Sequence, residues 1–449
     1  MSRFGTEVSG LERHTSLFTL EALEPLLPSR MVRQVLLASG RASRRCRDLP
    51  AEMVVWLMVA SGLWRCLGLR NVLAQMGQGA CTGLGWMAHG KPGTPPTSAA
   101  ICRARRRLGL RPMARLLRQM TSAWWQRCQE RLRWHGMAVI ALDGTTLRMP
   151  DTPQNVAHFG LHRVGRKRPC AFPFTRVLVA MCARTRVVLA RTVGVGRSSD
   201  LGLVARILRQ LPLHSLLLLD RGFFSYALFF DILARGHQVV ARARGKFTIL
   251  HRRRLGHRDY LVQIQVSRAR RRHRPDLPAF LELRMVSYKR PGFERVTLFT
   301  SLLDATRYPA AQIMDLYRQR WEVELGFDEI KTHQLAVRVP VRSKSPLLVL
   351  QEIDGLLLAY NAVRMYMAEA AQIRRIDPRR LSFTDALVRV RDITRRMAQA
   401  AGPRLPSLLR TFLRDLATCI LPPRRPRRYP RKIKHIPSRY PIRGASDAA

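Results

Sequence analysis

Two aspartates stand where buried strands are expected to end, and together they could hold a divalent metal ion. Asp143 follows the apolar run MAVIAL (137–142), and Asp220 follows LHSLLLL (213–219). A carboxylate at the end of a hydrophobic strand is costly unless something pairs with it, and a shared cation relieves the repulsion between two of them. Carboxylate oxygens are the ligands that Mg²⁺ prefers. For either residue alone, the alternative is that it ends its strand or caps the next helix.

A third carboxylate belongs to a helical pattern that also carries two cations and a phenol. The segment YRQRWEVELGFDEIK fits the spacing Tyr-x2-Arg-x3-Glu-x6-Lys through Tyr317, Arg320, Glu324 and Lys331. At about 100° per residue, these positions fall within roughly 60° of one another on the helix. Glu324 would bind the metal, and the two cations would bind phosphate oxygens. Asp328 shares this face as a substitute ligand, whereas Glu322 points to the opposite side; a solvated face with salt bridges is the alternative.

The elements around these acids predict a mixed α/β core. We expect, in order, three strands (137–142, 176–184 and 186–194), a helix (200–211), a strand (213–219), a helix (223–234) and a strand (237–244). The first and fourth strands should be central in the sheet. Short alternating strands follow up to about residue 301, and helices return at 309–334, 346–371 and 382–417. This pattern predicts an α/β fold with a β-rich insertion, preceded by an all-helical N-terminal domain.

Six segments follow from these patterns. They are a helical DNA-binding domain (1–132), the first part of the core (133–244), the β-rich insertion (245–305), the second part of the core carrying the Glu helix (306–371), a helical region (372–420) and a basic Pro/Arg-rich tail (421–449). Within the first segment, Arg105, Arg106 and Arg107 mark the candidate DNA-reading helix. A solvated basic face is the alternative for these three arginines.

The charge balance indicates a polyanionic partner. Among 449 residues, Lys and Arg number 79 against 30 Asp and Glu, which gives a formal net charge of +49. Such a charge repels itself unless a polyanion neutralises it, so nucleic acid is the expected partner. The 8 cysteines form no Cys-x-x-Cys pair, which is typical of a reducing cytosol rather than of a zinc site or a disulfide framework. The N-terminus lacks the apolar run that a signal peptide has. We therefore expect a cytoplasmic, nucleoid-associated protein without a membrane segment.

Taken together, the motifs resemble those of the insertion-sequence-4 family of DDE transposases. The Tyr-Arg-Glu-Lys spacing is similar to the family signature, Asp143-Gly144-Thr145 to its first acidic motif, and Asp220-Arg221-Gly222-Phe223 to its second. The helical N-terminal region also resembles that of the family. The resemblance covers the chain from about residue 20 to 371.

The resemblance implies an RNase H-like core and a metal-dependent reaction on DNA. Asp143, Asp220 and Glu324 would bind two Mg²⁺ ions, with Mn²⁺ able to substitute, for in-line attack on phosphodiesters. Tyr317, Arg320, Lys331 and Arg221 would hold phosphates. The partners would be double-stranded DNA, both the terminal inverted repeats and the target, bound by a homodimer. Where family members form a DNA hairpin, a flipped base stacks on an aromatic ring of the insertion; Phe247 or Tyr260 would have to serve here, or the step differs.

Two other functions fit the same residues. An RNase H-like nuclease or resolvase would cut DNA without joining it, and a catalytically silent derivative would only bind DNA. A nucleotide cofactor is not expected. Gly85-x4-Gly90-Lys91 imitates a phosphate-binding loop, but Pro92 stands where that loop needs Ser or Thr for magnesium.

Overall fold

The computed structural model describes residues 21–43, 49–80, 96–161, 163–164, 168–244, 247–335, 341–400 and 402–423. The chain divides into two compact units. The helical unit comprises Met1–Arg127, Arg148–Phe159 and Phe327–Pro422, and the sheet unit comprises Cys128–Leu147, Gly160–Gly326 and Pro423–Ala449. The domain bounds expected from the sequence stay a prediction. The phosphate-loop-like segment 85–91 and most of the expected basic tail, from residue 424 on, lie outside the described residues.

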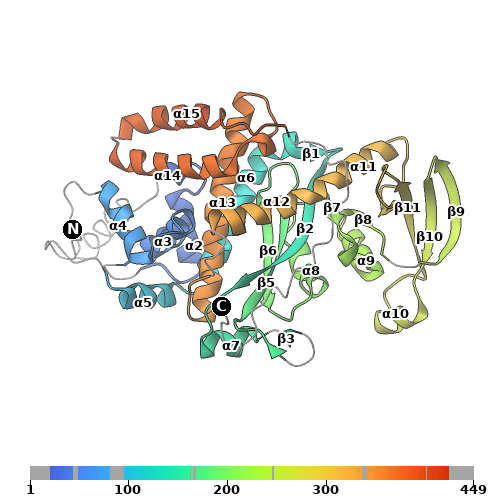
Figure 1. Ribbon diagram of the computed structural model, residues 1–449, viewed down its shortest axis with the longest axis horizontal. Helices are drawn as coiled ribbons and strands as arrows, with labels where there is room; N and C mark the ends of the chain where they lie inside the picture. Colours follow the sequence, from blue (N-terminus) through green and yellow to red (C-terminus); the bar gives the residue numbers. More distant parts are fainter. Residues whose placement is uncertain are drawn as a thin grey trace. The chain divides into compact units, whose positions relative to one another are not determined.

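One mixed sheet organises the sheet unit (Figure 1). Its order is β6-β5-β2-β7-β8-β12-β11-β10-β9, and β1 pairs with β2 at the side. The strands are β1 (Arg133–Trp134), β2 (Met137–Arg148), β5 (Phe174–Cys182), β6 (Val188–Val195), β7 (Ser215–Leu219), β8 (Gln238–Arg242), β9 (Ile249–Gly256), β10 (Asp259–Gln265), β11 (Phe280–Tyr288) and β12 (Val296–Thr300). A separate ribbon joins β3 (Arg163–Val164) to β4 (Arg168–Pro169). Since β2 and β7 are parallel neighbours inside the sheet, the prediction that the first and fourth strands are central is confirmed.

The strands of the expected insertion continue the main sheet. β12 pairs antiparallel with β8, and β11, β10 and β9 follow, each antiparallel to its neighbour. Between β10 and β11 the chain forms the short helix α10 (Arg268–His273). The strand β9 was not predicted, because its centre, His251 to Arg254, is exposed and charged at the sheet edge instead of alternating. Charge at such an edge discourages pairing with a further strand.

Apolar strands and one helix form the core beneath the acids. Alternate residues of β2 and β7, among them Val139 and Leu218, pack with Ile313, Leu316 and Tyr317 of α11 (Ala310–Arg318). The sheet unit also contains α8 (Asp200–Leu208) and α9 (Tyr226–Leu233), both somewhat shorter than expected. Each buried aliphatic side chain contributes about 1.5–3 kcal/mol. The helix α11, where the Tyr-Arg-Glu-Lys motif begins, therefore packs on β2 and β7, the two strands whose apolar runs are followed by aspartate.

The helix expected over 309–334 is not one regular helix. After α11 the chain forms a 3₁₀ turn, η3 (Gln319–Trp321), then α12 (Glu322–Asp328) and then a π-helical segment, η4 (Glu329–Gln334). The uniform rotation of about 100° per residue that placed the four motif residues on one face is therefore wrong for this segment. π-Helical turns are rare and are frequent at functional sites.

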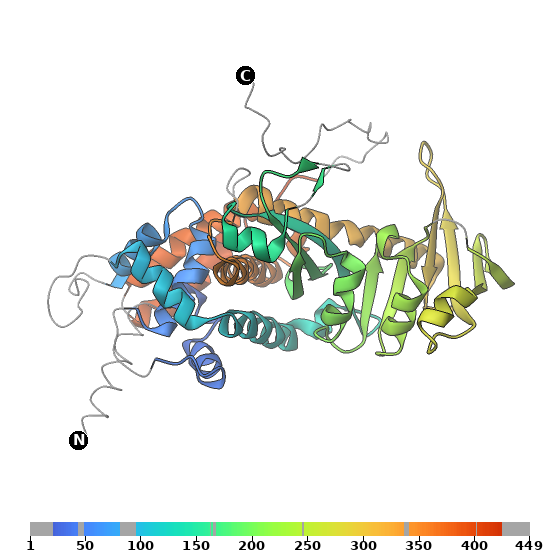
Figure 2. The ribbon, with the colours of Figure 1, turned by 90° about the horizontal axis from the view of Figure 1, so that it is seen from below.

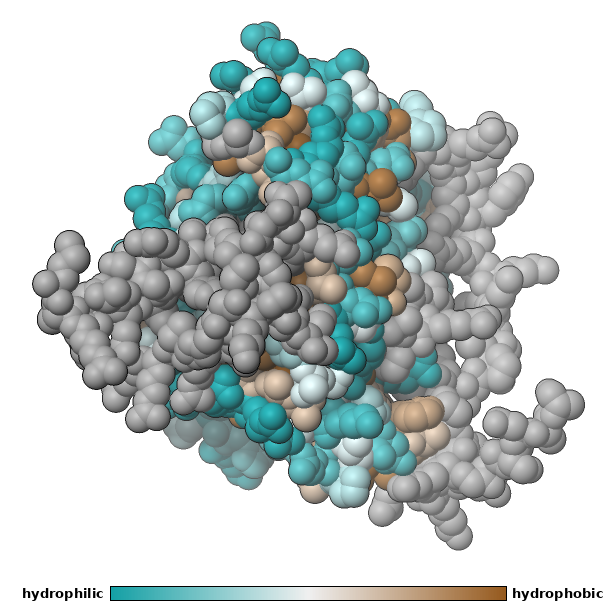
Figure 3. Space-filling view, turned by 90° about the vertical axis from the view of Figure 1, so that its left-hand side faces the viewer, coloured by the Kyte–Doolittle hydropathy of each residue, from teal (hydrophilic) through white to brown (hydrophobic). Residues whose placement is uncertain are grey.

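Packed helices make up the helical unit, and α13 runs through its middle (Figures 1 and 2). The helices are α2 (Ser29–Ala38), α3 (Ala51–Leu63), α4 (Leu69–Ala80), α5 (Ser98–Leu108), the first part of α6 (Arg111–Leu132), α7 (Pro153–Phe159), α13 (Pro346–Ile373), α14 (Phe383–Gln399) and α15 (Leu405–Leu416). Glycines let α3 and α13 approach closely, because a Cβ on Gly355 would stand 2.5 Å from the carbonyl oxygen of Met58. The face of this unit in Figure 3 is mostly hydrophilic, with small separate hydrophobic areas.

Among the described residues, α13 is the one helix long and apolar enough to cross a membrane, and 83% of its apolar window is buried. It also carries buried polar groups, which have protein partners. Arg364 donates to Glu329, and Tyr360 donates to the same carboxylate over 3.0 Å. The helix is therefore built as the core helix of its unit.

Candidate active site

The parallel register of β2 and β7 brings Asp143 and Asp220 to the same edge of the sheet. Ala141 pairs with Leu218, and each aspartate lies two residues further along its strand. The buried part of β2 ends at Leu142, although the strand itself continues to Arg148. Side chains that follow the carboxyl ends of neighbouring parallel strands lie close together, and the charge of Asp220 acts on Asp143.

Asp143 lies in an environment that opposes its ionisation. Its pKa is raised from 3.8 to about 6, mainly by burial and also by the charges of Asp220 and Glu324, whereas the N–H of Gly144 and the charge of Arg320 oppose the shift. Gly144 donates to Oδ1 over 2.7 Å. A carboxylate that is pushed toward its neutral form by burial and by two other acids is typical of a functional site, and a cation would reverse the shift.

The residue after Asp143 has to be small. A Cβ on Gly144 would stand 2.0 Å from Oδ1 of Asp200, the first residue of α8. Asp200 cannot easily move away, because both of its carboxylate oxygens accept hydrogen bonds from Arg176 on β5. The Asp-Gly pair could be recognised in the sequence only as a motif. The Arg176–Asp200 ion pair that explains the glycine was not predicted.

Asp220 begins the 3₁₀ turn η2 (Arg221–Phe223) as its N-cap. Its Oδ1 accepts from the N–H groups of Gly222 and Phe223, over 2.8 Å and 3.3 Å. Asp220 therefore caps the following turn, which was the alternative to metal binding. The cap uses one of its two carboxylate oxygens. Arg221 is exposed beside it.

Glu324 and Arg320 form an ion pair within the sheet unit. Nη2 of Arg320 donates to Oε1 of Glu324 over 2.9 Å; the Arg320 side chain is 8% exposed and that of Glu324 is 39% exposed. Glu322 has another role, because Arg186 donates to its Oε2 over 2.7 Å. Trp321 is 49% exposed, with the guanidinium of Arg320 4.8 Å from its ring centre.

Tyr317 makes a contact that the sequence did not predict. Its hydroxyl donates to the carbonyl oxygen of Leu219 over 3.1 Å, immediately before Asp220. The residue is 6% exposed, and burial raises the pKa of its hydroxyl to about 12, so the phenol stays a neutral donor. In this arrangement Tyr317 holds the end of β7, and its contact to a phosphate stays a prediction.

The last motif residue, Lys331, lies on η4 and belongs to the helical unit, whereas the three acids belong to the sheet unit. Its side chain is exposed. Asp328 also belongs to the helical unit, and its Oδ1 accepts from the hydroxyl of Thr332 over 2.7 Å. The structure therefore brings together Asp143, Asp220, Glu324, Arg320 and Tyr317, and the role predicted for Lys331 stays a prediction.

The donor set of the three acids fits divalent metal ions, although it is not arranged as a finished site. Oδ1 of Asp143, Oδ1 of Asp220 and Oε1 of Glu324 accept hydrogen bonds from the protein. The second carboxylate oxygen of each acid therefore remains for a cation. Among the residues that the structure describes, no three Asp, Glu, His or Cys side chains are grouped closely enough to hold a metal ion. Members of the DDE transposase family use divalent ions, and here the side chains would have to turn toward the ion.

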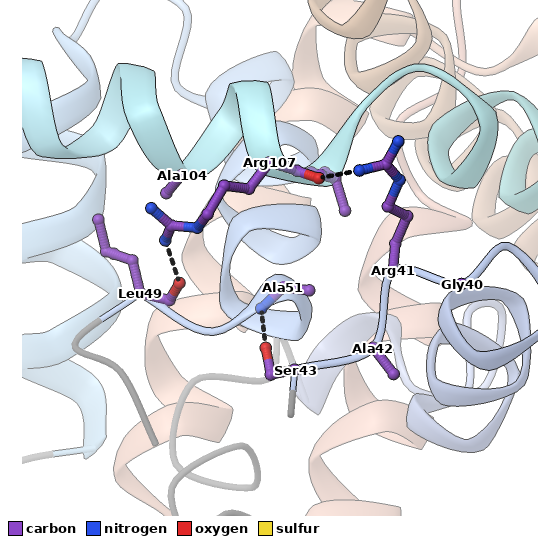
Figure 4. Close-up of a pocket in the computed structure, with 9 residues that line it drawn as sticks. Gly40, Arg41, Ala42, Ser43, Leu49, Ala51, Ala104 and Arg107 are labelled. Atoms are coloured by element: carbon purple, nitrogen blue, oxygen red, sulfur yellow. Dashed lines mark hydrogen bonds between the residues drawn. The ribbon is translucent and has the colours of Figure 1, made fainter. Parts of the chain in front are cut away.

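The three consecutive arginines of α5 do not form one exposed face. Arg105 is 3% exposed, and its Nη2 donates to the hydroxyl of Ser343 and to the carbonyl oxygen of Leu348. The expectation that Arg105 reads a DNA groove is therefore not supported, because its guanidinium is bound inside the helical unit. Arg107 donates to the carbonyl oxygen of Leu49 over 3.3 Å at the wall of a small pocket (Figure 4). Arg106 and Arg107 are exposed, and their contact with DNA stays a prediction.

The two rings considered for a flipped base are both in contact with other side chains. Phe247 meets Phe299 edge to face, with ring centres 4.8 Å apart. The guanidinium of Arg252 lies 3.4 Å from the ring centre of Tyr260. Either ring would have to exchange its partner before it could stack on a base, so neither is presented as an open platform.

Comparisons with known proteins show the family of the chain. Residues 134–362 match the transposase DDE domain family, and residues 17–118 match the insertion element 4 transposase N-terminal family. The chain is 31% identical over 426 residues to the transposase InsG for insertion sequence element IS4 of Escherichia coli, which covers 94% of this chain and 93% of that one. It is 27% identical over 210 residues to the putative transposase InsZ of the same organism, across 47% of this chain and 66% of that one.

Among solved structures, a piggyBac transposase synaptic complex with hairpin DNA covers 91% of this chain and 85% of its own, at 12% identity and a TM-score of 0.39. The family matches and the similarity to InsG extend over both acidic motifs and the Tyr-Arg-Glu-Lys segment. The chain belongs to the insertion-sequence-4 family of DDE transposases.

Proposed function

We propose that this protein carries out cut-and-paste transposition. It binds the ends of an insertion sequence, cleaves the DNA there and joins the released 3′ ends to a target. The observation that carries the proposal is the parallel register of β2 and β7, which places Asp143 and Asp220 at one edge of the sheet, where the charges of Asp220 and Glu324 act on the buried carboxyl of Asp143. Membership in a transposase family supplies the class of reaction.

Asp143, Asp220 and Glu324 would hold the divalent metal ions, Mg²⁺ by preference, through the oxygens that the protein leaves unbound. When bound, two such ions supply positive charge to the attacking and leaving oxygens of a phosphodiester. Asp143 has to lose its proton to act as a ligand. Its raised pKa means that this proton is held up to about pH 6 in the metal-free protein.

Two further residues support the acids. Arg320 uses Nη2 for Glu324, which leaves its other N–H groups for a phosphate oxygen of the DNA. Tyr317 keeps the end of β7 in place through Leu219, and therefore positions Asp220. Lys331 and Arg221 are exposed cations that would contact flanking phosphates. These contacts orient the scissile bond, and orientation is a large part of catalysis in phosphoryl transfer.

The formal charge of +49 supports extensive contact with double-stranded DNA, both at the terminal inverted repeats and at the target. Since two ends have to be cut and joined together, the active assembly would be a homodimer with one end on each copy. Arg106 and Arg107 on α5 remain the candidates for contacts to the end sequence.

The test is incubation of the purified protein with element-end DNA and MgCl₂, followed by electrophoresis of cleaved and joined products. Asp143→Asn and Glu324→Gln should lose both cleavage and joining and still bind the DNA. Asp315→Asn is a matched control, because its side chain is 67% exposed and forms a surface ion pair of 2.8 Å with Arg318. It should cleave as the unaltered protein does.

Each outcome separates the candidate functions. Cleavage together with joining supports transposition, and cleavage without joining would instead indicate a nuclease or resolvase. Binding without any cleavage in Mg²⁺ or Mn²⁺ would indicate a catalytically silent DNA-binding protein. Equal cleavage by Asp143→Asn would remove Asp143 from the site.

A further inference from the structure

A second cavity, which none of the three acids lines, lies entirely within the helical unit. It has a volume of about 680 Å³ and is lined by residues of α3, α5, α7, the start of α13 and the segments before them. Sites that bind small molecules measure roughly 300–1,000 Å³. The cavity is therefore large enough for a ligand of several rings or groups, and nothing in the proposed reaction uses it.

One side of the cavity is strongly basic. Its lining includes the cations Arg65, Arg105, Arg106, Arg342 and Lys344 and one acid, Glu352. The acid is already neutralised, because Arg65 forms a buried ion pair with it and the main-chain N–H groups of residues 342 and 343 donate to it over 2.9 Å. An excess of four positive charges remains around the cavity. Charges in a partly enclosed space are costly without a counter-ion, so this side is built for an anion.

On the basic side, the hydrogen-bond donors of Arg105 are not all paired with acceptors. Its guanidinium is held in place by Nη2, which donates to Ser343 over 3.1 Å and to Leu348 over 2.7 Å. Its Nε is buried and has no hydrogen-bond partner. A buried guanidinium N–H without an acceptor costs roughly 1–3 kcal/mol. An acceptor oxygen that reached this N–H would satisfy it, and burial lowers the pKa of Arg105 in a way that a bound anion would oppose.

Apolar residues also line the cavity. Met58, Leu69, Ile101 and Leu348 contribute to it, and Pro153 adds a further apolar surface. An anionic group next to a flat or apolar group is the chemistry of a nucleotide. Because the protein belongs to a family of transposases, which act on DNA, this ligand class is favoured over other amphipathic anions.

We propose that this cavity is a nucleotide-binding site, with the phosphate on its arginine-rich side and the base against its apolar residues. The inference deepens the proposed function when the nucleotide is part of the DNA strand. A free nucleotide offers the same chemistry, and the experiment separates the two sources. The site requires none of the three catalytic acids, so it can be tested in a protein that does not cleave DNA.

Cys102 provides the readout, because it is a free and partly exposed cysteine in the cavity lining. The rate of its alkylation by iodoacetamide is measured by peptide mass spectrometry, with Cys419, which is not in the lining, as the reference within the same chain. Thymidine 5′-monophosphate should protect Cys102 in a saturable manner. Thymidine without the phosphate should require at least about tenfold higher concentration, because the charge-assisted hydrogen bonds are lost.

Variants test the basic side without removing a buried group. Arg106→Ala and Lys344→Ala change exposed side chains of the lining, so both should fold, and each should weaken protection by about three- to tenfold. Arg103→Ala is the matched control, because Arg103 is exposed on the same helix and is not part of the lining. It should leave protection unchanged. All measurements are repeated in Asp143→Asn, where a failed active site would not affect them.

A short 5′-phosphorylated single strand identifies the source of the nucleotide. Protection of Cys102 by the strand at lower concentration than by the mononucleotide assigns the site to DNA. Protection by the mononucleotide but not by the strand assigns it to a free nucleotide. The proposal is overturned if neither protects Cys102, if thymidine protects as well as its monophosphate, or if the Arg106→Ala/Lys344→Ala double variant binds like the unaltered protein.

Discussion

Replacing Asp143 by Asn should stabilise the folded protein while it abolishes cleavage. Burial, with the charges of Asp220 and Glu324, raises the pKa of Asp143 from 3.8 to about 6. One pKa unit corresponds to about 1.36 kcal/mol, so the ionised carboxylate lowers the free energy of unfolding by about 3 kcal/mol. An asparagine keeps an acceptor oxygen for the N–H of Gly144, and it carries no charge that burial or the neighbouring acids would disfavour.

The effect has a defined dependence on pH. The folded protein holds this proton more tightly than the unfolded chain does, so the free energy of unfolding falls as the pH rises from about 4 to about 6 and then levels off. In metal-free buffer, the stability gained by Asp143→Asn should be about 3 kcal/mol at pH 7.5 and about half of that at pH 5. Adding Mg²⁺ should stabilise the unaltered protein more than the variant.

Urea unfolding followed by tryptophan fluorescence and circular dichroism, with EDTA present, measures this difference at both pH values. Asp315→Asn is the control, and it should change the free energy of unfolding by less than about 0.5 kcal/mol because its carboxylate is largely exposed. The reasoning is refuted if Asp143→Asn is no more stable than the unaltered protein at pH 7.5. It is also refuted if the gain is the same at pH 5.

Further substitutions and one solvent change test other parts of the structure. Tyr317→Phe removes the donor to Leu219 and should cost about 1 kcal/mol in urea unfolding and slow cleavage, with DNA affinity in gel shifts unchanged; weakened affinity would favour a phosphate contact instead. Gly144→Ala should cost about 1–3 kcal/mol and abolish cleavage, because the added Cβ overlaps Asp200, and normal cleavage would contradict this. Arg364→Met should lower the free energy of unfolding by about 3–5 kcal/mol, since it leaves a buried carboxylate without its partner; an effect below 1 kcal/mol would speak against that ion pair. Raising the salt concentration should weaken DNA binding steeply in fluorescence anisotropy, by a slope of about −0.9 per phosphate contact, and a flat response would contradict extensive backbone contact.

The two aspartates could be predicted from the sequence because each follows an apolar run whose burial is dictated by composition. A strand such as 137–142 has no polar residue to place toward water, so it has to be internal, and the residue that follows it emerges at the sheet edge. The order of strands and helices then placed the first and fourth strands in the centre, and β2 and β7 are indeed parallel neighbours.

Other expectations failed because they depended on regularity or exposure. A helical wheel assumes one rotation per residue, and the 3₁₀ and π-helical turns around α12 break that rotation. Arg105 looked like its two neighbours in a basic run, but the sequence cannot tell which arginine of a helix faces inward to bond Ser343. β9 has no alternation to recognise, because both of its faces are exposed at an edge.

The sequence by itself determined the family and the mixed α/β core, and it predicted the three acids, since these follow from residue type, order and spacing. Only the tertiary structure decided how the acids are supported. The Asp200 carboxylate that requires Gly144, the Leu219 carbonyl that binds Tyr317 and the second cavity all depend on contacts between residues far apart in the chain. Such contacts are set by packing and by the pairing of buried polar groups, and local sequence patterns carry little information about either.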